Sequence, residues 1–146
     1  MGSRLYDELR EQRSLCYWVS TSMSDYGGQT LLFVSCSVSP PRLEEAYEQI
    51  TGILADLCAH GPSEEEARRF CAYASGAVAL DFESVTNRLD HAIQLIIEYA
   101  DHAIDPLLLL REIESVTRSG LAELAAKIEL SPCVACVGPA SDINFR

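Results

Sequence analysis

The sequence predicts an α+β fold, with helices layered on one face of a small, mostly antiparallel sheet. Two observations predict this fold. Two segments near the N-terminus alternate apolar and polar residues, as β-strands do, and from about residue 39 the apolar period changes from two to 3.6, as in helices. The chain has 146 residues, 48% of them hydrophobic, which is enough for one domain with a buried core.

The first elements are a helix and a hairpin. The segment SRLYDELREQR is typical of a helix, and it leads directly into LCYWVSTSM, which alternates as a strand does. The segment SDYGGQ then indicates a loop of several residues, where Gly27 and Gly28 can adopt positive φ. TLLFVSCSV is a second strand, so the two strands form a β-hairpin. In the first strand we expect one face to carry Leu15, Tyr17, Val19, Thr21 and Met23.

Two long helices follow the hairpin. SPPRLEEAYEQITGILADLCAHG has an apolar stripe and ends at Gly61. PSEEEARRFCAYASGAVALDF begins with a capping box, in which Ser63 caps the first turn and Glu66 reaches back. The stripe of the first helix consists of Leu43, Tyr47, Ile50, Ile53, Leu54 and Leu57, and that of the second of Ala67, Phe70, Cys71, Ala74, Ala77 and Val78.

The remaining elements are three helices and a late strand. We expect a helix over about 84–102, with an inward face formed by Val85, Leu89, Ile93, Ile96 and Ile97. Asp105 and Pro106 are typical of a helix start and precede LLLLREIESV, and TRSGLAELAAKI predicts a last helix. CVACVGP then predicts a short buried strand.

Three strands are few for so many helices, and such a sheet would leave exposed edges. We therefore expect residues 1–146 to be a single domain fragment, truncated at the N-terminus, whose preceding strands are absent. The open edge also predicts self-association, as a homo-oligomer, when the chain is isolated.

Charge and composition exclude several classes of partner. The net charge is −11, and Lys127 is the only lysine, so neither nucleic acid nor an anionic membrane is an expected partner. The sequence has no apolar run near the roughly 20 residues that span a bilayer. The six cysteines lie within apolar patterns, which predicts buried reduced thiols and a cytoplasmic location.

Metal-binding patterns are weak. The histidines, His60, His91 and His102, lack the spacing of a helical zinc motif. Cys133 and Cys136 have the spacing of half a zinc or redox site, but residues i and i+3 of a strand point to opposite faces, so buried strand thiols are the better interpretation. The acidic run SEEEARR is explained by a capped, solvated first helical turn.

Five segments in one order resemble a known family. SRLYDELREQRSLCYWVSTS, RLEEAYEQITGILADL, GPSEEEARRFCAYASGAVALDFESVTNRL, REIESVTRSGLAELAAKI and CVACVGP together are similar to the second half of an insulinase/pitrilysin-type zinc metallopeptidase, the group that includes the mitochondrial processing peptidases. The likeness extends from about Gly2 to Pro139, although no single motif decides it.

The resemblance implies a two-part peptidase around an enclosed chamber. Its N-terminal domain carries the zinc motif H-x-x-E-H, and its second, C-terminal domain is metal-free and contacts the peptide substrate. This chain would then be the C-terminal domain without its first third, partnered by a catalytic domain on the same or another chain. It contains no H-x-x-E-H, so we expect it to bind no zinc and to hydrolyse no peptide alone.

The resemblance also implies two site residues, Arg10 and Tyr17, seven residues apart; Arg13 fits this pattern less well. A tyrosine hydroxyl can donate a hydrogen bond to the oxygen of an attacked carbonyl, and a guanidinium can bind backbone carbonyls or hold the tyrosine. The alternative is an exposed helical arginine and a tyrosine that fills the sheet face beside Val19.

Three functions therefore remain open. The first is the non-catalytic, substrate-contacting domain of a zinc metalloendopeptidase. The second is a catalytically inactive scaffold or partner subunit with the same fold, which would not need Arg10 and Tyr17. The third is a cysteine-based metal or redox module.

Overall fold

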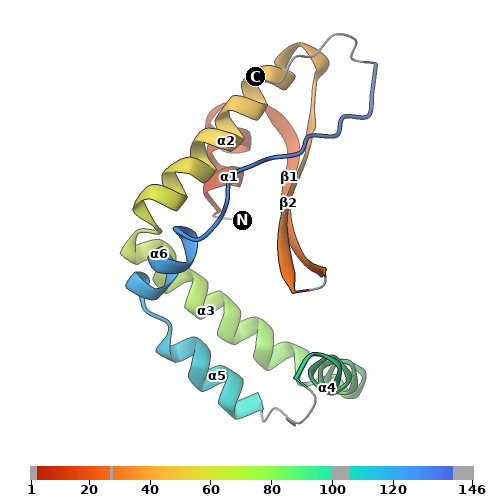
Figure 1. The fold of residues 1–146 in the computed structure, drawn as a ribbon, viewed down its shortest axis with the longest axis vertical. Coiled ribbons are helices and arrows are strands. Elements are labelled where there is room, and N and C mark those ends of the chain that lie inside the picture. The colour runs from red at the N-terminus through yellow and green to blue at the C-terminus, as the bar shows by residue number, and fades with distance from the viewer. Residues whose placement is uncertain (1–2, 27, 100–105, 140–146) are drawn as a thin grey trace. The chain divides into compact units, whose positions relative to one another are not determined.

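The computed structural model of the chain describes residues 3–26, 28–99 and 106–139 (Figure 1). Its elements are α1 (Arg4–Tyr6), the π-helix η1 (Asp7–Gln12), β1 (Cys16–Tyr26), β2 (Gln29–Val38), the 3₁₀-helix η2 (Pro40–Arg42), α2 (Leu43–His60), α3 (Glu64–Asp81), α4 (Val85–Tyr99), α5 (Pro106–Ser115) and α6 (Arg118–Ala125). The chain divides into two compact units, Met1–Asp56 with Glu129–Arg146, and Leu57–Ile128. The expectation of one domain fragment stays a prediction.

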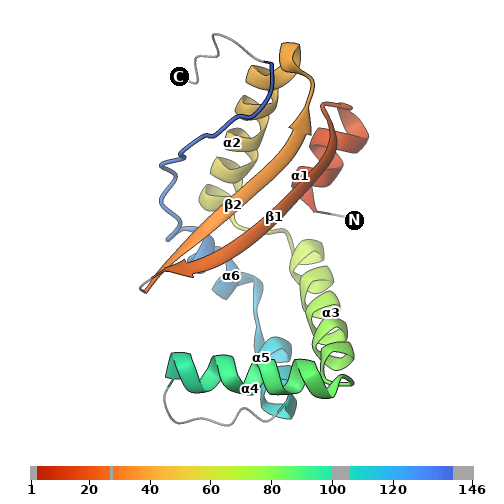
Figure 2. The same cartoon turned by 90° about the vertical axis from the view of Figure 1, so that its right-hand side faces the viewer.

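The predicted α+β class is confirmed, and the hairpin lies in the first unit. β1 and β2 pair antiparallel from Cys16↔Val38 to Tyr26↔Gln29 (Figure 2). β1 extends to Tyr26 and β2 begins at Gln29, so the expectation of a loop of several residues was wrong; Gly27 lies outside the described residues. The strands extend into the predicted turn because Asp25 and Thr30 pair across the ladder, where the Thr30 hydroxyl donates to the Asp25 carboxylate. Gly28 has the predicted positive φ, +87°.

The core of the first unit is a cluster where the N-terminal helical segment meets the hairpin. Leu9 is completely buried, and Leu5, Leu15 and Cys16 are at most 7% exposed. Half-buried side chains from the hairpin and from α2 pack against this cluster: Val19, Val34, Cys36, Val38, Ile50 and Ile53. The N-terminal segment and α2 therefore both pack against the hairpin.

The opening helix departs from the predicted α-helix after one turn. The Arg13 N–H donates to the Glu8 carbonyl at 3.2 Å, and the Leu15 N–H donates to the Leu9 carbonyl at 2.7 Å. These bonds span five and six residues instead of four, so the backbone forms the wider turn of a π-helix. The wide turn allows both Leu9 and Leu15 to point into the core.

Both long helices and the capping box are confirmed. The predicted stripe of α2 is half-buried throughout. At the start of α3 the Glu66 N–H donates to the Ser63 hydroxyl at 3.2 Å, and the Ser63 N–H donates to the Glu66 carboxylate at 2.7 Å. Gly61 follows α2 with φ +69°, and a Cβ there would lie 2.5 Å from the Cβ of Ala122, so glycine is required on both counts.

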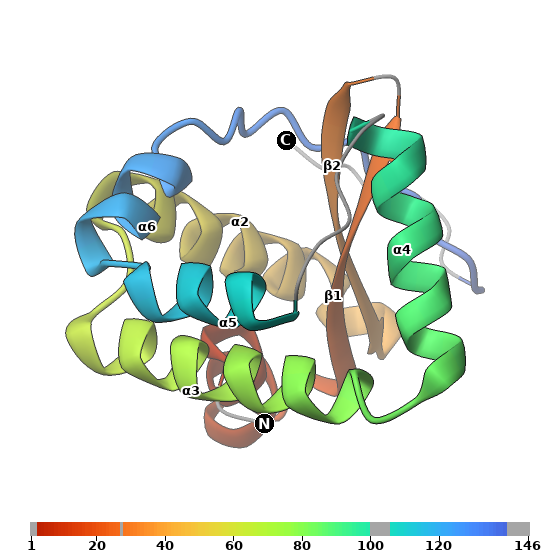
Figure 3. The ribbon, with the colours of Figure 1, turned by 90° about the horizontal axis from the view of Figure 1, so that it is seen from below.

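The second unit is helical over its described residues. α3 and α5 lie side by side (Figure 3), and Ala67 and Ala125 are its buried apolar residues. α5 begins at Pro106 as predicted, whereas Asp105 lies outside the described residues. Thr117 caps α6 by accepting the Gly120 N–H at 3.2 Å.

The prediction that the apolar stripe of α4 faces inward was wrong. Val85, Leu89, Ile93, Ile96 and Ile97 are between 45% and 76% exposed. The periodicity correctly predicts an amphipathic helix, but it does not determine whether another element covers the apolar face. Of the residues described in the second unit, none covers it.

The predicted late strand was also wrong. Residues 131–137 have no regular secondary structure, and Cys133 and Cys136 are exposed rather than buried. Val137 is fully exposed, and residues 131–137 pair with no strand of the described part of the chain. All six cysteines are free thiols. Among the described residues, we find no helix with the length and apolar character needed to cross a bilayer.

Leu9 is expected to dominate the stability of the first unit. Replacing Leu9 with alanine removes a fully buried side chain and should lower the free energy of unfolding by about 2–4 kcal/mol. Urea unfolding followed by the fluorescence of Trp18, the single tryptophan, reports on this unit. Leu124→Ala removes a 62% exposed leucine from the other unit, and it should change the same transition by less than about 0.5 kcal/mol. Equal effects of the two variants would contradict this account of the core.

The thiols should differ in reactivity. Burial raises the pKa of Cys16 and is the main cause of its shift, while the exposed Cys133 and Cys136 are open to reagent. At pH 8 we expect iodoacetamide to modify Cys16 at least about tenfold more slowly than the two exposed cysteines, because Cys16 is covered and burial raises its pKa. Mass spectrometry of the separate peptides measures each rate. Rates equal to those of the urea-unfolded chain would contradict the burial of Cys16.

Candidate functional site

Arg10 lies on the solvent side of the π-helical turn. Its Nη1 donates to the Tyr6 hydroxyl at 2.7 Å, and its guanidinium carbon lies 5.0 Å from the centre of the Tyr6 ring. The carboxylate of Glu11 is 3.9 Å from its Nε, and the Arg10 side chain is 42% exposed. Tyr6 therefore orients the guanidinium through both its hydroxyl and its ring, while part of the guanidinium stays open to a ligand.

A β-bulge directs Tyr17 toward solvent. Cys16 pairs with Val38, but the next paired residue of β1 is Trp18, opposite Ser37, so the register shifts across Tyr17. Tyr17 is consequently 82% exposed. The expectation that Tyr17 shares a face with Val19, and the alternative that it fills that face, are both wrong, because a bulge reverses the alternation.

Arg10 and Tyr17 line the same hollow, which lies within the first unit. This hollow is open and has a volume of about 710 Å³. Its other lining residues come from the junction between η1 and β1 and from the end of β2: Glu11, Ser14, Leu15, Cys16, Ser37, Val38 and Ser39. The structure thus brings the two predicted site residues to one surface, with hydroxyls and backbone groups around them.

Sequence reasoning missed most of the lining of this hollow. Ser14 has φ +49°, which makes it the only non-glycine residue with positive φ in the described part of the chain. No residue type in the sequence marks that conformation, since serine favours neither this φ nor a bulge. Tyr6, four residues before Arg10, could have been found from helical spacing, which places i and i+4 on one face.

Cys16 is one of the two buried residues that line the hollow. Burial raises its pKa, and the nearby positive charge of Arg10 opposes that shift as the smaller effect. The thiol therefore stays protonated near neutral pH and is no activated nucleophile. Its contribution to the hollow is apolar surface.

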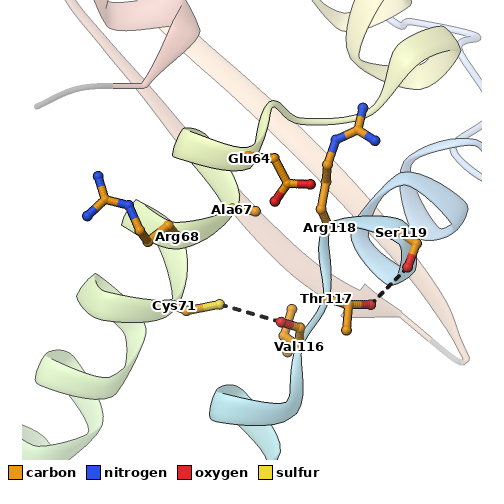
Figure 4. Close-up of a pocket in the computed structure, with 8 residues that line it drawn as sticks. All are labelled: Glu64, Ala67, Arg68, Cys71, Val116, Thr117, Arg118 and Ser119. Atoms are coloured by element: carbon orange, nitrogen blue, oxygen red, sulfur yellow. Dashed lines mark hydrogen bonds between the residues drawn. The ribbon is translucent and has the colours of Figure 1, made fainter.

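A second hollow, of about 460 Å³, lies in the second unit between the starts of α3 and α6 (Figure 4). It is lined by Glu64, Ala67, Arg68, Cys71, Val116, Thr117, Arg118 and Ser119. The guanidinium groups of Arg68 and Arg118 point away from each other (Figure 4), and Arg118 Nε donates to the Pro62 carbonyl at 2.8 Å. The Cys71 thiol is directed at the Val116 carbonyl, 4.0 Å away. The cationic groups do not converge on a common ligand position.

The donor groups of the described residues do not fit a zinc ion. Within the described ranges, no three His, Cys, Asp or Glu side chains gather closely enough to hold a metal. His60 is exposed and ends α2, and the ring of His91 stacks on Phe82 with centroids 5.3 Å apart. His102 lies outside the described residues. Cys133 and Cys136 lie on an irregular segment, without the second ligand pair of a structural zinc site.

Comparison with known proteins identifies related sequences. A family model described as the peptidase M16 inactive domain matches residues 1–72. A protein of Mycobacterium leprae, named an uncharacterized zinc protease, is 29% identical over 83 residues, which are 57% of this chain and 19% of that protein. A Mycobacterium tuberculosis protein of the same description is 26% identical over 118 residues, which are 80% of this chain and 26% of that protein. The chain thus matches about a fifth to a quarter of the length of these relatives.

A solved structure shares the fold. The crystal structure of the periplasmic protease PqqL from Escherichia coli superposes with a TM-score of 0.68 at 21% identity, over 87% of this chain and 14% of that one. At this identity the likeness establishes the fold alone. The family model over residues 1–72 and the named relatives agree with the resemblance found in the sequence, and together they support an insulinase-like M16 inactive, C-terminal domain.

Proposed function

We propose that this chain is the non-catalytic, substrate-contacting part of a zinc metalloendopeptidase that cleaves peptides in an enclosed chamber. The observation that supports the proposal best is the bulge at Tyr17. It exposes 82% of a tyrosine beside a half-exposed arginine, on a shared hollow. Exposure alone does not mark a site, since Tyr26 on the same hairpin is 62% exposed; what supports the proposal is that Tyr17 and Arg10 line one hollow.

The chemistry of the pair suits a peptide substrate. The oxygen of a peptide carbonyl gains negative charge as the bond is attacked, and the Tyr17 hydroxyl can donate a hydrogen bond to it. The Arg10 guanidinium carries a permanent charge and can donate to backbone carbonyls of the same peptide. Since Tyr6 already holds one side of Arg10, little side-chain freedom is lost when a peptide binds.

The catalytic metal belongs, on this proposal, to a partner. The family is one of zinc peptidases, and in it a catalytic domain partners with the inactive one. We propose that an N-terminal catalytic domain, on the same or another chain, holds the zinc and forms the other wall of the chamber. Self-association of the isolated chain and a cytoplasmic location also remain proposals; the exposed apolar face of α4 supports the first of them.

The isolated chain should hold no zinc and cleave no peptide. Elemental analysis of the purified chain should find far less than one zinc per chain, and a quenched fluorescent peptide should stay intact, because the described residues offer no three-ligand cluster. One zinc per chain would contradict the proposal. In that case loss of the metal in a Cys133→Ser, Cys136→Ser double variant would establish the cysteine-based alternative.

Tyr17→Phe should impair cleavage by the complete peptidase that contains this chain. Loss of one hydrogen-bond donor to a transition-state oxygen typically lowers kcat by about 10²–10³-fold. Folding should be unaffected, because the side chain is exposed. The measurement is kcat and KM for a fluorogenic peptide.

Tyr26→Phe is the matched control, since Tyr26 is 62% exposed at the far end of the hairpin and lines neither hollow. Its kinetics should equal those of the unaltered enzyme. Unchanged kcat in Tyr17→Phe would overturn the proposed role and favour the scaffold function.

A further inference from the structure

The junction that separates Arg10 from Tyr17 is held by an arginine from elsewhere in the first unit. Arg42, at the end of η2, donates from Nη1 to the Ser14 carbonyl at 3.1 Å and to the Arg13 carbonyl at 3.4 Å. Ser14 is the residue with φ +49°, between the π-helical turn and β1. Arg42 thus contacts the one strained position on the path between the two proposed site residues.

The guanidinium of Arg42 is itself fixed. Its Nε and Nη2 donate to the two carboxylate oxygens of Glu45 at 3.1 and 3.3 Å. Such two-point pairing sets the plane of the guanidinium, which leaves Nη1 directed at the junction. The pair is three residues apart at the start of α2, so helical spacing maintains it.

Arg42 also connects two segments that line the hollow. Its backbone N–H donates to the Ser39 carbonyl at 2.9 Å, and Ser39 lines the hollow from the end of β2. Its side chain donates to the carbonyl of Ser14, which lines the hollow from the junction before β1. One residue therefore fixes the end of β2 to the start of β1 on the side where the bulge lies.

We infer that Arg42, held by Glu45, is a positioning residue that sets the geometry of Arg10 and Tyr17 through the Arg13–Ser14 carbonyls. A non-glycine residue in the left-handed region costs free energy and persists only when its surroundings hold it there. Charged hydrogen bonds to the carbonyl of that residue supply such a restraint. The effect of Arg42 on peptide cleavage rests on the proposed function, whereas its effect on the Arg13–Ser14 junction does not.

The junction itself is tested in the chain alone, by Arg42→Met. We expect the Ser14 amide coupling constant and Cα chemical shift, measured by NMR, to lose the signature of a positive φ. We also expect alkylation of Cys16 to accelerate at least about tenfold, since local opening uncovers it. Arg118→Met is the matched control, because Arg118 likewise donates to two backbone carbonyls, those of His60 and Pro62, but in the other unit. It should leave both readouts unchanged.

Two milder variants guard against a general loss of folding. Arg42→Lys keeps the positive charge but loses the two-point pairing of the guanidinium. Glu45→Gln weakens the hydrogen bonds that hold Arg42 in place. Both variants should therefore give intermediate rates of Cys16 alkylation. If Arg42→Met leaves the Ser14 signals and the Cys16 rate unchanged, or if Arg118→Met alters them equally, the inference is overturned.

The consequence for the site is tested in the complete peptidase. Arg42→Met should lower kcat about tenfold or more with little change in KM, and its effect should shrink when Tyr17 is already phenylalanine, because both act on one hydrogen bond. Full additivity of the two changes would overturn the positioning role while leaving the proposed function intact. If Tyr17→Phe alone has no effect, the proposed function fails, whereas the Ser14 and Cys16 readouts still decide the role of Arg42 at the junction.

Discussion

The burial of Leu9 and Leu15 in one cluster is the constraint on which the geometry of the hollow depends. Leu9 has no exposed surface and Leu15 is 3% exposed, although only five residues separate them. A regular α-helix followed directly by a strand would not bring both side chains inward with a hydrogen bond between their backbones. The wide π-helical turn does so, since the Leu15 N–H reaches the Leu9 carbonyl at 2.7 Å. The residues between them must therefore project outward, and Arg10 is among them.

The same cluster adjoins the bulge. Leu15 directly precedes β1, and both Leu15 and Cys16 are buried. The register of β1 then shifts between Cys16 and Trp18. As a consequence Tyr17 is exposed, because Cys16 and Val19 share the core face and Tyr17 is the displaced residue between them. The burial of these apolar side chains thus leaves Arg10 and Tyr17 on the outside.

Sequence periodicity predicted the elements well where each segment is long and its pattern is local. The helices α2 and α3, the capping box at Ser63 and the hairpin all follow from nearest-neighbour chemistry. The π-helical turn and the bulge could not be predicted, because each is a one-residue change of hydrogen-bond register decided by which side chains the core accepts. The predictions of a strand at residues 131–137 and of a buried apolar face on α4 were wrong for another reason. A strand needs a partner strand, and an amphipathic helix needs another element to cover its apolar face. The sequence of the segment alone does not show whether such a partner is present.

A domain without metal ligands can still contribute to catalysis through backbone geometry that positions ordinary side chains. For the roles proposed, Tyr17 and Arg10 need a fixed direction toward the substrate. Ser14 holds a conformation that costs of order 1 kcal/mol, and such strain persists only when several restraints act together. Here three do: the leucine cluster, the Leu9–Leu15 backbone bond, and Arg42 with its Glu45 anchor. Because these restraints converge on a junction that lies between Arg10 and Tyr17 and lines the same hollow, they favour a role in positioning the two side chains.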